Sequence, residues 1–172
     1  PKPSSAASDV YKRQKENRRD IENCRQMIAD TLHAKKSEIY FTAGGSEGDN
    51  WALKEIADTY GEKGRHIITT KLEHHGILHT CEYLEKHGFD VTYLDVDAYG
   101  RVNPEQAEQA IRKDTILISV MFANNEVGTI QPIGEIGAIA RRHNILFHTD
   151  AVQAYGQIPI CLLYTSDAAD EG

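Results

Sequence analysis

The chain has 172 residues, 40% of them hydrophobic, which is enough for one domain with a substantial core and too little for two complete domains. Its net charge of −7 and the lack of a basic stripe argue against a nucleic-acid surface. No run approaches the ~20 apolar residues that a membrane helix needs, so we expect no membrane segment.

The three cysteines, Cys24, Cys81 and Cys161, are an odd number and lack the spacing of a metal site. Reduced thiols are therefore expected, as in a cytoplasmic protein. Cys24 and Cys81 fall on apolar faces of predicted helices, which favours a place in the core for both.

The first predicted elements are a helix and a strand. Apolar residues recur at helical spacing from Lys15 to about His33 and predict an amphipathic helix. The segment 39–42 follows as a short predicted strand. Ser46 with Asp49 three residues later has the pattern of a capping pair, and it predicts the start of a second helix that ends near Gly61.

Strands and helices then alternate to residue 149. An Asn cap at Asn103 followed by Pro104 marks one of the helix starts. The remaining predicted elements are strand 65–71, helix 74–87, strand 90–94, strand 115–121, helix 132–143 and strand 145–149. This alternation predicts an α/β fold with three αβα layers and a largely parallel sheet.

Polar side chains follow two of the apolar strands. Asn124 and Asn125 come after strand 115–121, and Asp150 and Gln153 come after strand 145–149. Because parallel strands open on one edge, these groups are expected at one site beyond their carboxyl ends. Amide groups and a single carboxylate suit a flat, polar, heteroaromatic ligand.

Two further motifs are predicted at the same edge. Gly44, Gly45 and Ser46 lie between a strand and a helix start, where free backbone N–H groups favour a phosphate, although such turns are often only structural. His74 and His75 stand at the next helix start. His79, four residues after His75, leaves a metal pair open, but no Cys or carboxylate ligand lies at suitable spacing, so we predict no metal.

Four segments together resemble successive motifs of the cysteine desulfurases, which belong to the class V aminotransferase group of pyridoxal-phosphate enzymes. The resemblance spans about residues 15 to 160. The segments are Phe41-Thr42-Ala43-Gly44-Gly45-Ser46-Glu47, Glu73-His74-His75, Asn124-Asn125-Glu126-Val127-Gly128 and Asp150-Ala151-Val152-Gln153.

The resemblance implies the large domain of a fold-type I enzyme, with pyridoxal 5′-phosphate as cofactor. It implies that Gly45 and Ser46 hold the phosphate, with Ser46 in place of the usual Thr. His74 would stack on the ring and transfer protons. Of the remaining positions, Asn125 and Gln153 would contact the region of the ring's 3′ oxygen, and Asp150 would pair with the pyridine nitrogen.

The implied reaction is removal of sulfur from L-cysteine, giving alanine and an enzyme persulfide for iron–sulfur cluster assembly or another sulfur-transfer pathway. A sulfur-acceptor or scaffold protein and a homodimer are the implied partners of a full-length parent. Two alternatives stay open: a selenocysteine lyase or aminotransferase of the same group, and a non-enzymatic nucleotide- or phosphate-binding module, although a full G-x-G-x-x-G motif is missing.

The chain also departs from the family pattern. It has no Ser-x-His-Lys motif for the lysine that attaches the cofactor, and no cysteine in the nucleophile's motif. We therefore expect an internal fragment that is itself inactive. Residues 15–160 would belong to the cofactor-binding domain, whereas 1–14 and 161–172 have no apolar period and are expected to be non-native or disordered ends.

Overall fold

The computed structural model describes residues 5–160, which fall into two compact units, one reaching Phe41 and the other beginning at Thr42. The first unit contains the long helix α1 (Ser5–Leu32) and the 3-10 helix η1 (Lys36–Glu38). No helix among residues 5–160 is both long and apolar enough to cross a bilayer. The prediction that residues 161–172 are a non-native or disordered end lies outside the described residues. The same prediction for residues 1–14 stays a prediction, although α1 is helical from Ser5.

Polar contacts hold the chain where it turns back after α1. Lys36 Nζ lies 2.6 Å from Glu22 Oε2. The Arg25 guanidinium donates to the Ile39 carbonyl and lies 4.8 Å from the ring centroid of Phe41. The predicted strand 39–42 is wrong: these residues form no strand, because Arg25 takes a backbone acceptor and no strand of the described residues pairs with them.

The prediction of a core position for Cys24 is also wrong. Cys24 is exposed, and so is Ile21 in the same apolar stripe of α1. The described residues of this unit contain no second layer that could cover the stripe, so helical periodicity alone did not ensure burial. Cys81, in contrast, is fully buried as predicted.

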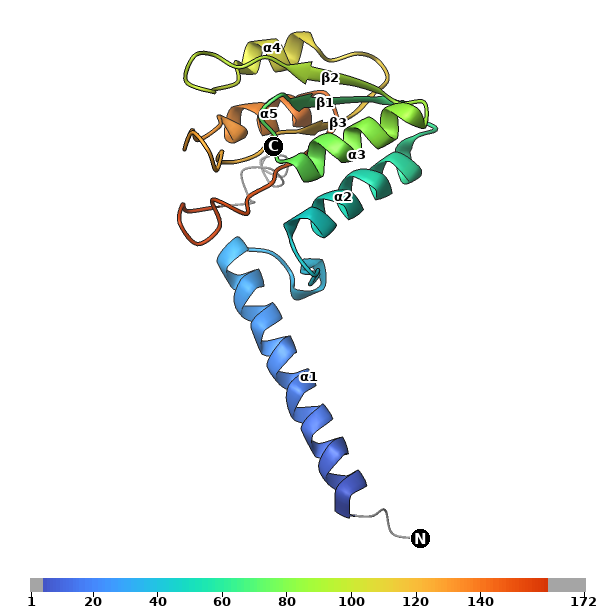
Figure 1. Cartoon of the computed structure of the whole chain (residues 1–172), viewed down its shortest axis with the longest axis vertical. Coiled ribbons are helices and arrows are strands. Elements are labelled where there is room, and N and C mark those ends of the chain that lie inside the picture. The colour runs from blue at the N-terminus through green and yellow to red at the C-terminus, as the bar shows by residue number, and fades with distance from the viewer. Residues whose placement is uncertain (1–4, 161–172) are drawn as a thin grey trace, which may run out of the picture. The chain divides into compact units, whose positions relative to one another are not determined.

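The second unit is built on a four-stranded sheet in which every pairing is parallel (Figure 1). The strand order is β2-β1-β3-β4. The strands are β1 (His66–Thr70), β2 (Asp90–Leu94), β3 (Thr115–Ser119) and β4 (Leu146–His148). The two central strands β1 and β3 are buried along their whole length, which explains why, apart from His66, they contain only apolar and hydroxyl-bearing residues.

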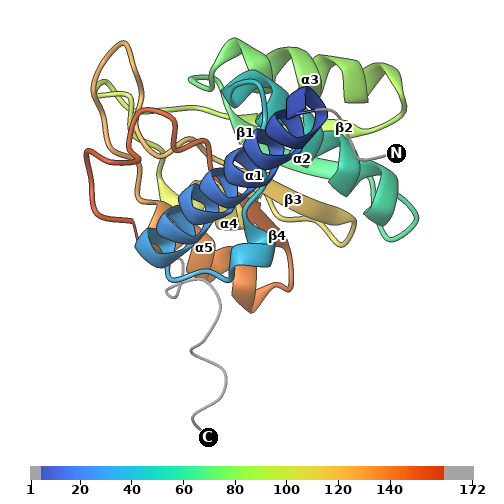
Figure 2. The same cartoon turned by 90° about the horizontal axis from the view of Figure 1, so that it is seen from below.

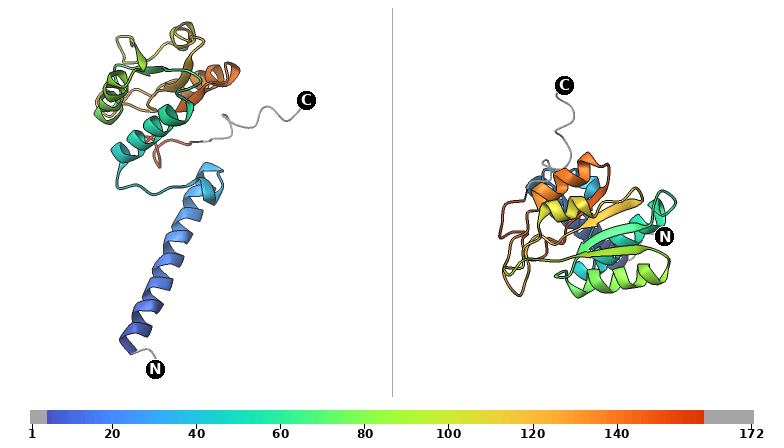
Figure 3. Two further views of the ribbon diagram at one scale, coloured as in Figure 1. Left: turned by 90° about the vertical axis from the view of Figure 1, so that its right-hand side faces the viewer. Right: turned by 90° about the horizontal axis from the view of Figure 1, so that it is seen from above.

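Helices cover both faces of this sheet (Figures 1 and 3). α2 (Gly45–Tyr60) and α3 (His75–Lys86) lie side by side on one face (Figure 2), and α4 (Pro104–Gln109) and α5 (Ile133–Arg142) cover the other. Each face has its own apolar cluster, one around Leu53, Ile77 and Leu117 and one around Ile68, Ile118 and Ile136. The predicted three-layer αβα fold with a parallel sheet is confirmed.

The two predicted helix caps differ in outcome. The Asn103 side chain accepts a hydrogen bond from Glu105 N at 2.9 Å and caps α4 as predicted. The Ser46 cap is wrong, because α2 begins one residue earlier, with the extended Gly44 as its N-cap and no capping side chain. The Glu47 carboxylate instead accepts from the N–H of Ala43 in the turn before the helix.

A buried acid fastens the loop after β1 to the end of β3. Glu73 is 5% exposed, and its Oε1 accepts hydrogen bonds from Thr70 Oγ1 at 2.9 Å and Met121 N at 3.0 Å. Burial outweighs these bonds and the nearby carboxylates add to it, raising the pKa of Glu73 to about 7. Ionised Glu73 makes the stronger hydrogen bonds, but its desolvation outweighs them, so this clamp adds most to the stability of the fold when the carboxyl group is protonated.

The pH dependence of stability tests this clamp. Because the pKa is raised from 4.5 to about 7 in the folded state, Glu73 binds more protons folded than unfolded, and its contribution to stability falls as pH rises through this interval. Glu73→Gln keeps a carbonyl acceptor and cannot ionise. The variant should gain stability relative to the wild type between pH 4.5 and 7, on the order of 1–3 kcal/mol, in denaturant titrations.

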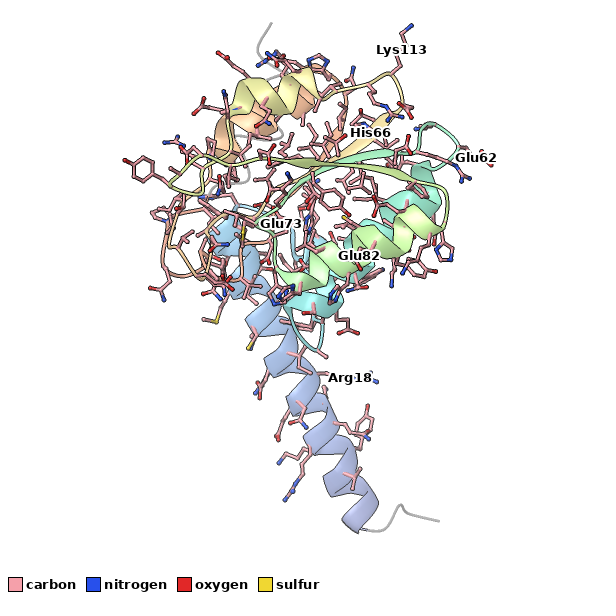
Figure 4. All side chains as sticks on the ribbon, turned by 45° about the horizontal axis from the view of Figure 1, so that its top comes forward. Arg18, Glu62, His66, Glu73, Glu82 and Lys113 are labelled. Carbon is pink, nitrogen blue, oxygen red and sulfur yellow. The ribbon has the colours of Figure 1, made fainter. Side chains whose placement is uncertain are left out.

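Glu82→Gln is the matched control, since Glu82 is exposed on α3 whereas Glu73 lies against the sheet (Figure 4). Its stability difference from the wild type should stay constant over the same pH range. A flat difference for Glu73→Gln as well would show that Glu73 does not titrate as described.

Candidate functional site

A pocket of about 220 Å³ opens beyond the carboxyl ends of the central strands. All six predicted binding residues line it, together with three residues that the sequence did not single out for this role. The lining residues are Gly45, Ser46, Asp49, His74, Met121, Asn125, Asp150, Val152 and Gln153. The predicted meeting of Ser46, His74 and Asp150 in one cleft is thus found, while their chemical roles stay predictions.

The start of α2 forms one wall of the pocket. Gly45 is the first residue of the helix, and a Cβ at this position would lie 2.8 Å from Val152 Cγ2, so only glycine fits here without displacing that side chain. The N–H groups of Gly45, Ser46 and Glu47 have no acceptor within the helix, because the first intrahelical bond runs from Gly48 N to Gly44 O at 3.1 Å. These free donors and the helix dipole favour an anion.

His74 caps the neighbouring helix. Its Nδ1 accepts a hydrogen bond from Gly76 N at 3.0 Å, so α3 begins with a histidine in the N-cap position. Because Nδ1 is an acceptor, the proton of the neutral ring is on Nε2. The starts of α2 and α3 approach each other closely at Gly76, where a Cβ would lie 3.2 Å from Ser46 Oγ.

Asp150 is held where β3 and β4 run on past their last paired residues. Its carbonyl accepts from Phe122 N at 2.8 Å, and its Oδ1 accepts from Val152 N at 2.9 Å. The side chain is only partly exposed. These two bonds fix the carboxylate in the pocket wall and fix Val152 beside the start of α2.

The two adjacent asparagines have different surroundings. Asn125 is exposed and lines the pocket. Asn124 is buried and does not line it, so its predicted place in the site is wrong. Its Nδ2 donates to the Leu72 carbonyl at 3.0 Å, and its Oδ1 accepts from Glu126 N and Val127 N at 2.9 Å each. Asn124 therefore shapes the loop that presents Asn125.

Sequence reasoning missed Asp49 and His148. Asp49 lies in the pocket wall, and its Oδ1 is 3.7 Å from Nε2 of His148. The spacing of both residues could have indicated them. Asp49 is three residues after Ser46 on a helix, and His148 is two residues before Asp150 in extended chain. Residues at these spacings lie on the same face of their element. The first spacing was interpreted as a capping pair instead.

Burial dominates the electrostatics of this pair. It raises the pKa of Asp49 to about 6, with a further upward contribution from Asp150 and an opposing one from His74. Burial lowers the pKa of His148 to about 4, against the attraction of Asp150. As the pH rises, His148 therefore loses its proton before Asp49, which is the reverse of the order for free histidine and aspartate.

The histidines at the start of α3 do not form a metal centre. The His75 and His79 rings stack with centroids 5.7 Å apart. Within residues 5–160, no group of three or more His, Cys, Asp or Glu side chains has the geometry to hold a metal ion.

Comparison with known proteins places this geometry in a family. Residues 3–164 match the model of the aminotransferase class-V family. The cysteine desulfurase IscS of Methanosarcina thermophila is 58% identical over 153 residues, which are 89% of this chain and 38% of that protein. The cysteine desulfurase IscS of Clostridium botulinum (strain Kyoto / Type A2) is 55% identical over the same shares of the two chains.

A solved structure described as SspA in complex with cysteine agrees with these relatives. It superposes with a TM-score of 0.85 at 45% identity, over 88% of this chain and 44% of that one. The chain thus spans about two fifths of the length of the curated relatives that it matches. Since the family model covers most of the sequence, the chain belongs to the aminotransferase class-V family.

Proposed function

We propose that this chain is the cofactor-binding part of a pyridoxal-phosphate-dependent cysteine desulfurase, which removes sulfur from L-cysteine and leaves alanine and an enzyme persulfide. The observation that carries the proposal is the pocket in which the start of α2, the cap of α3 and Asp150 meet. Relatives named cysteine desulfurase and a related structure with bound cysteine support the choice of substrate.

The residues of the pocket fit the proposed cofactor at both of its charged ends. The free N–H groups at the start of α2 and the Ser46 hydroxyl would hold the phosphate. Asp150 would pair with the ring nitrogen and keep it protonated, and Asn125 and Gln153 would contact the oxygen on the ring. When bound, pyridoxal phosphate supplies an electron sink for the substrate carbanion.

His74 is the proposed acid–base residue. The bond from Gly76 N holds Nδ1, so the ring is oriented by its own helix. Nε2 then remains as the atom that exchanges a proton with the substrate. In this role the imidazole would stack on the cofactor ring.

Several wider features belong to the same proposal. Residues 15–160 would contribute to the large domain, and the lysine that attaches the cofactor and the nucleophilic cysteine would come from the parent protein outside this chain. The parent would act in the cytoplasm as a homodimer. It would pass sulfur to an acceptor or scaffold protein, for iron–sulfur cluster assembly among other uses.

The nucleotide-module alternative explains less of the pocket. A nucleotide phosphate would use the start of α2, but a nucleotide offers no cation to the two carboxyl groups, Asp49 and Asp150, that line the same cavity. A ligand with an anionic end and a cationic end would bind the start of α2 with the first and the two carboxyl groups with the second.

Binding measurements with two probes test the assignment of the two ends. Ser46→Ala should weaken the binding of both pyridoxal phosphate and inorganic phosphate by about 1.5–3 kcal/mol, the contribution of a hydrogen bond to a charged group. Asp150→Asn should weaken pyridoxal phosphate only, because inorganic phosphate has no ring nitrogen. Equilibrium dialysis of the 172-residue chain gives both affinities.

Ser37→Ala and Asp58→Asn are the matched controls, since both side chains are exposed and neither lines the pocket. They should leave both affinities unchanged. Equal effects of Asp150→Asn on the two probes would contradict the pairing of Asp150 with the ring nitrogen.

Turnover by the parent protein tests the role of His74. Asn is a good N-cap, so His74→Asn keeps the start of α3 but removes the titratable ring. We expect cysteine turnover to fall about 10²- to 10⁴-fold with the cofactor still bound and the melting temperature unchanged. Wild-type turnover by this variant would remove His74 from the mechanism.

His74→Ala serves as the comparison. It loses the cap as well as the ring, so it should lower stability by about 0.5–2 kcal/mol and turnover by the same factor as His74→Asn. A turnover loss only in the Ala variant would mean that His74 acts through the helix cap.

A further inference from the structure

The pocket contains a second carboxyl group besides Asp150. Asp49 lines the pocket but is only 5% exposed. Among residues 5–160, its buried Oδ2 has no hydrogen-bond partner, and its Oδ1 lies 3.7 Å from His148 Nε2. An ionised carboxylate in such surroundings is costly, so this group needs a proton or a cation.

His148 connects Asp49 to the interior of the sheet. Its Nδ1 lies 2.9 Å from Oγ of Ser119, a fully buried residue at the end of β3. When the Ser119 hydroxyl donates to Nδ1, the ring proton is on Nε2 and faces Asp49. When the hydroxyl accepts instead, Nε2 carries a lone pair and faces a protonated Asp49. In either arrangement His148 is neutral and offers no cation to Asp49.

The other charged groups around Asp49 come from three parts of the unit. Asp150, after β4, raises the pKa of Asp49, and His74, at the start of α3, lowers it. Asp49 and Asp150 both raise the pKa of Glu73 in the loop after β1. Negative groups thus predominate around Asp49, which favours its protonated form in the empty pocket.

We propose that Asp49 is a second carboxyl group of the cofactor pocket, which faces the neutral ring of His148 and, once it loses its own proton, adds a negative charge beside Asp150 toward the cationic ring. The inference rests on the proposed function and deepens it. The charge of Asp49 would add to that of Asp150 in attracting the cationic ring. Asp49 is therefore a positioning residue and takes no direct part in the reaction.

The pKa of Asp49 sets the pH at which this charge appears. Since burial and Asp150 raise the pKa of Asp49 to about 6, the group is uncharged at pH 5 and ionised at pH 7.5. His148 remains neutral at both values because burial lowers its pKa to about 4. Asp49 therefore adds one negative charge to the pocket between pH 5 and 7.5, and a bound cation would shift the ionisation of Asp49 to lower pH.

The test compares affinities of the wild type and Asp49→Asn for pyridoxal phosphate at the two pH values. Comparison at the same pH cancels the titration of the cofactor itself. The dissociation constant of Asp49→Asn should be close to that of the wild type at pH 5 and about three- to tenfold higher at pH 7.5, as for a coupling of roughly 0.5–1 pKa unit. With inorganic phosphate as probe, Asp49→Asn should bind as tightly as the wild type or more tightly.

Asp58→Asn is the matched control. It removes the same charge from the same helix, nine residues or about 14 Å further along, at an exposed position. Its dissociation constants should equal those of the wild type at both pH values. A pH-independent loss for Asp49→Asn with both probes would show a structural role, and wild-type affinity throughout would show no role; either result overturns the proposal.

A measurement on the unaltered chain does not depend on the folding of a variant. Carboxyl ¹³C and imidazole NMR titrations should give Asp49 a midpoint near 6 and His148 a midpoint near 4. An ordinary aspartate value for Asp49 would overturn the proposal. If the wild type binds no pyridoxal phosphate at any pH while these two midpoints hold, the proposed function fails and the protonated state of Asp49 in the empty pocket stands.

Discussion

The parallel arrangement of the four strands is the constraint on which the pocket depends. Because every strand runs the same way, the segments after β1, β3 and β4 all emerge at one edge, and α3 begins there. α2 precedes β1 and is joined to it by a short turn, so α2 also starts at this edge. The start of α2, the cap of α3 and Asp150 therefore meet without any long loop. Reversal of a single central strand would move its polar residues to the opposite edge.

Charge at this edge is distributed unevenly. The starts of α2 and α3 contribute positive dipole ends, whereas Asp49, Glu73 and Asp150 contribute carboxyl groups within or beneath the same cavity. Burial delays the ionisation of two of these acids to higher pH, since the pKa values of Asp49 and Glu73 are raised to about 6 and 7. Of the three, only Asp150 has its Oδ1 bound by the backbone N–H two residues later.

The sequence predicted the elements that repeat a pattern, and it failed where one segment depends on another. A continuous apolar run identified β3, since only a strand covered on both faces has such a composition. The segment 39–42 has strand-like residues but no neighbouring strand to pair with, and local sequence does not contain that information. Asp49 was assigned to a cap because its spacing from Ser46 fits one, whereas the close approach of Gly45 to Val152 at the observed helix start involves a residue 107 positions away along the chain.

The two walls of the pocket together narrow the class of ligand more than either does alone. Free N–H groups at a helix start favour any anion, and this feature is common to nucleotide and cofactor sites. Two carboxyl groups in the same cavity repel an anion that lacks a cationic part, by an amount that grows as the site is desolvated. A compact ligand with a phosphate at one end and a protonated ring nitrogen at the other satisfies both walls at once. The spacing between Ser46 and Asp150, fixed by Val152 against Gly45, then sets which such ligands fit.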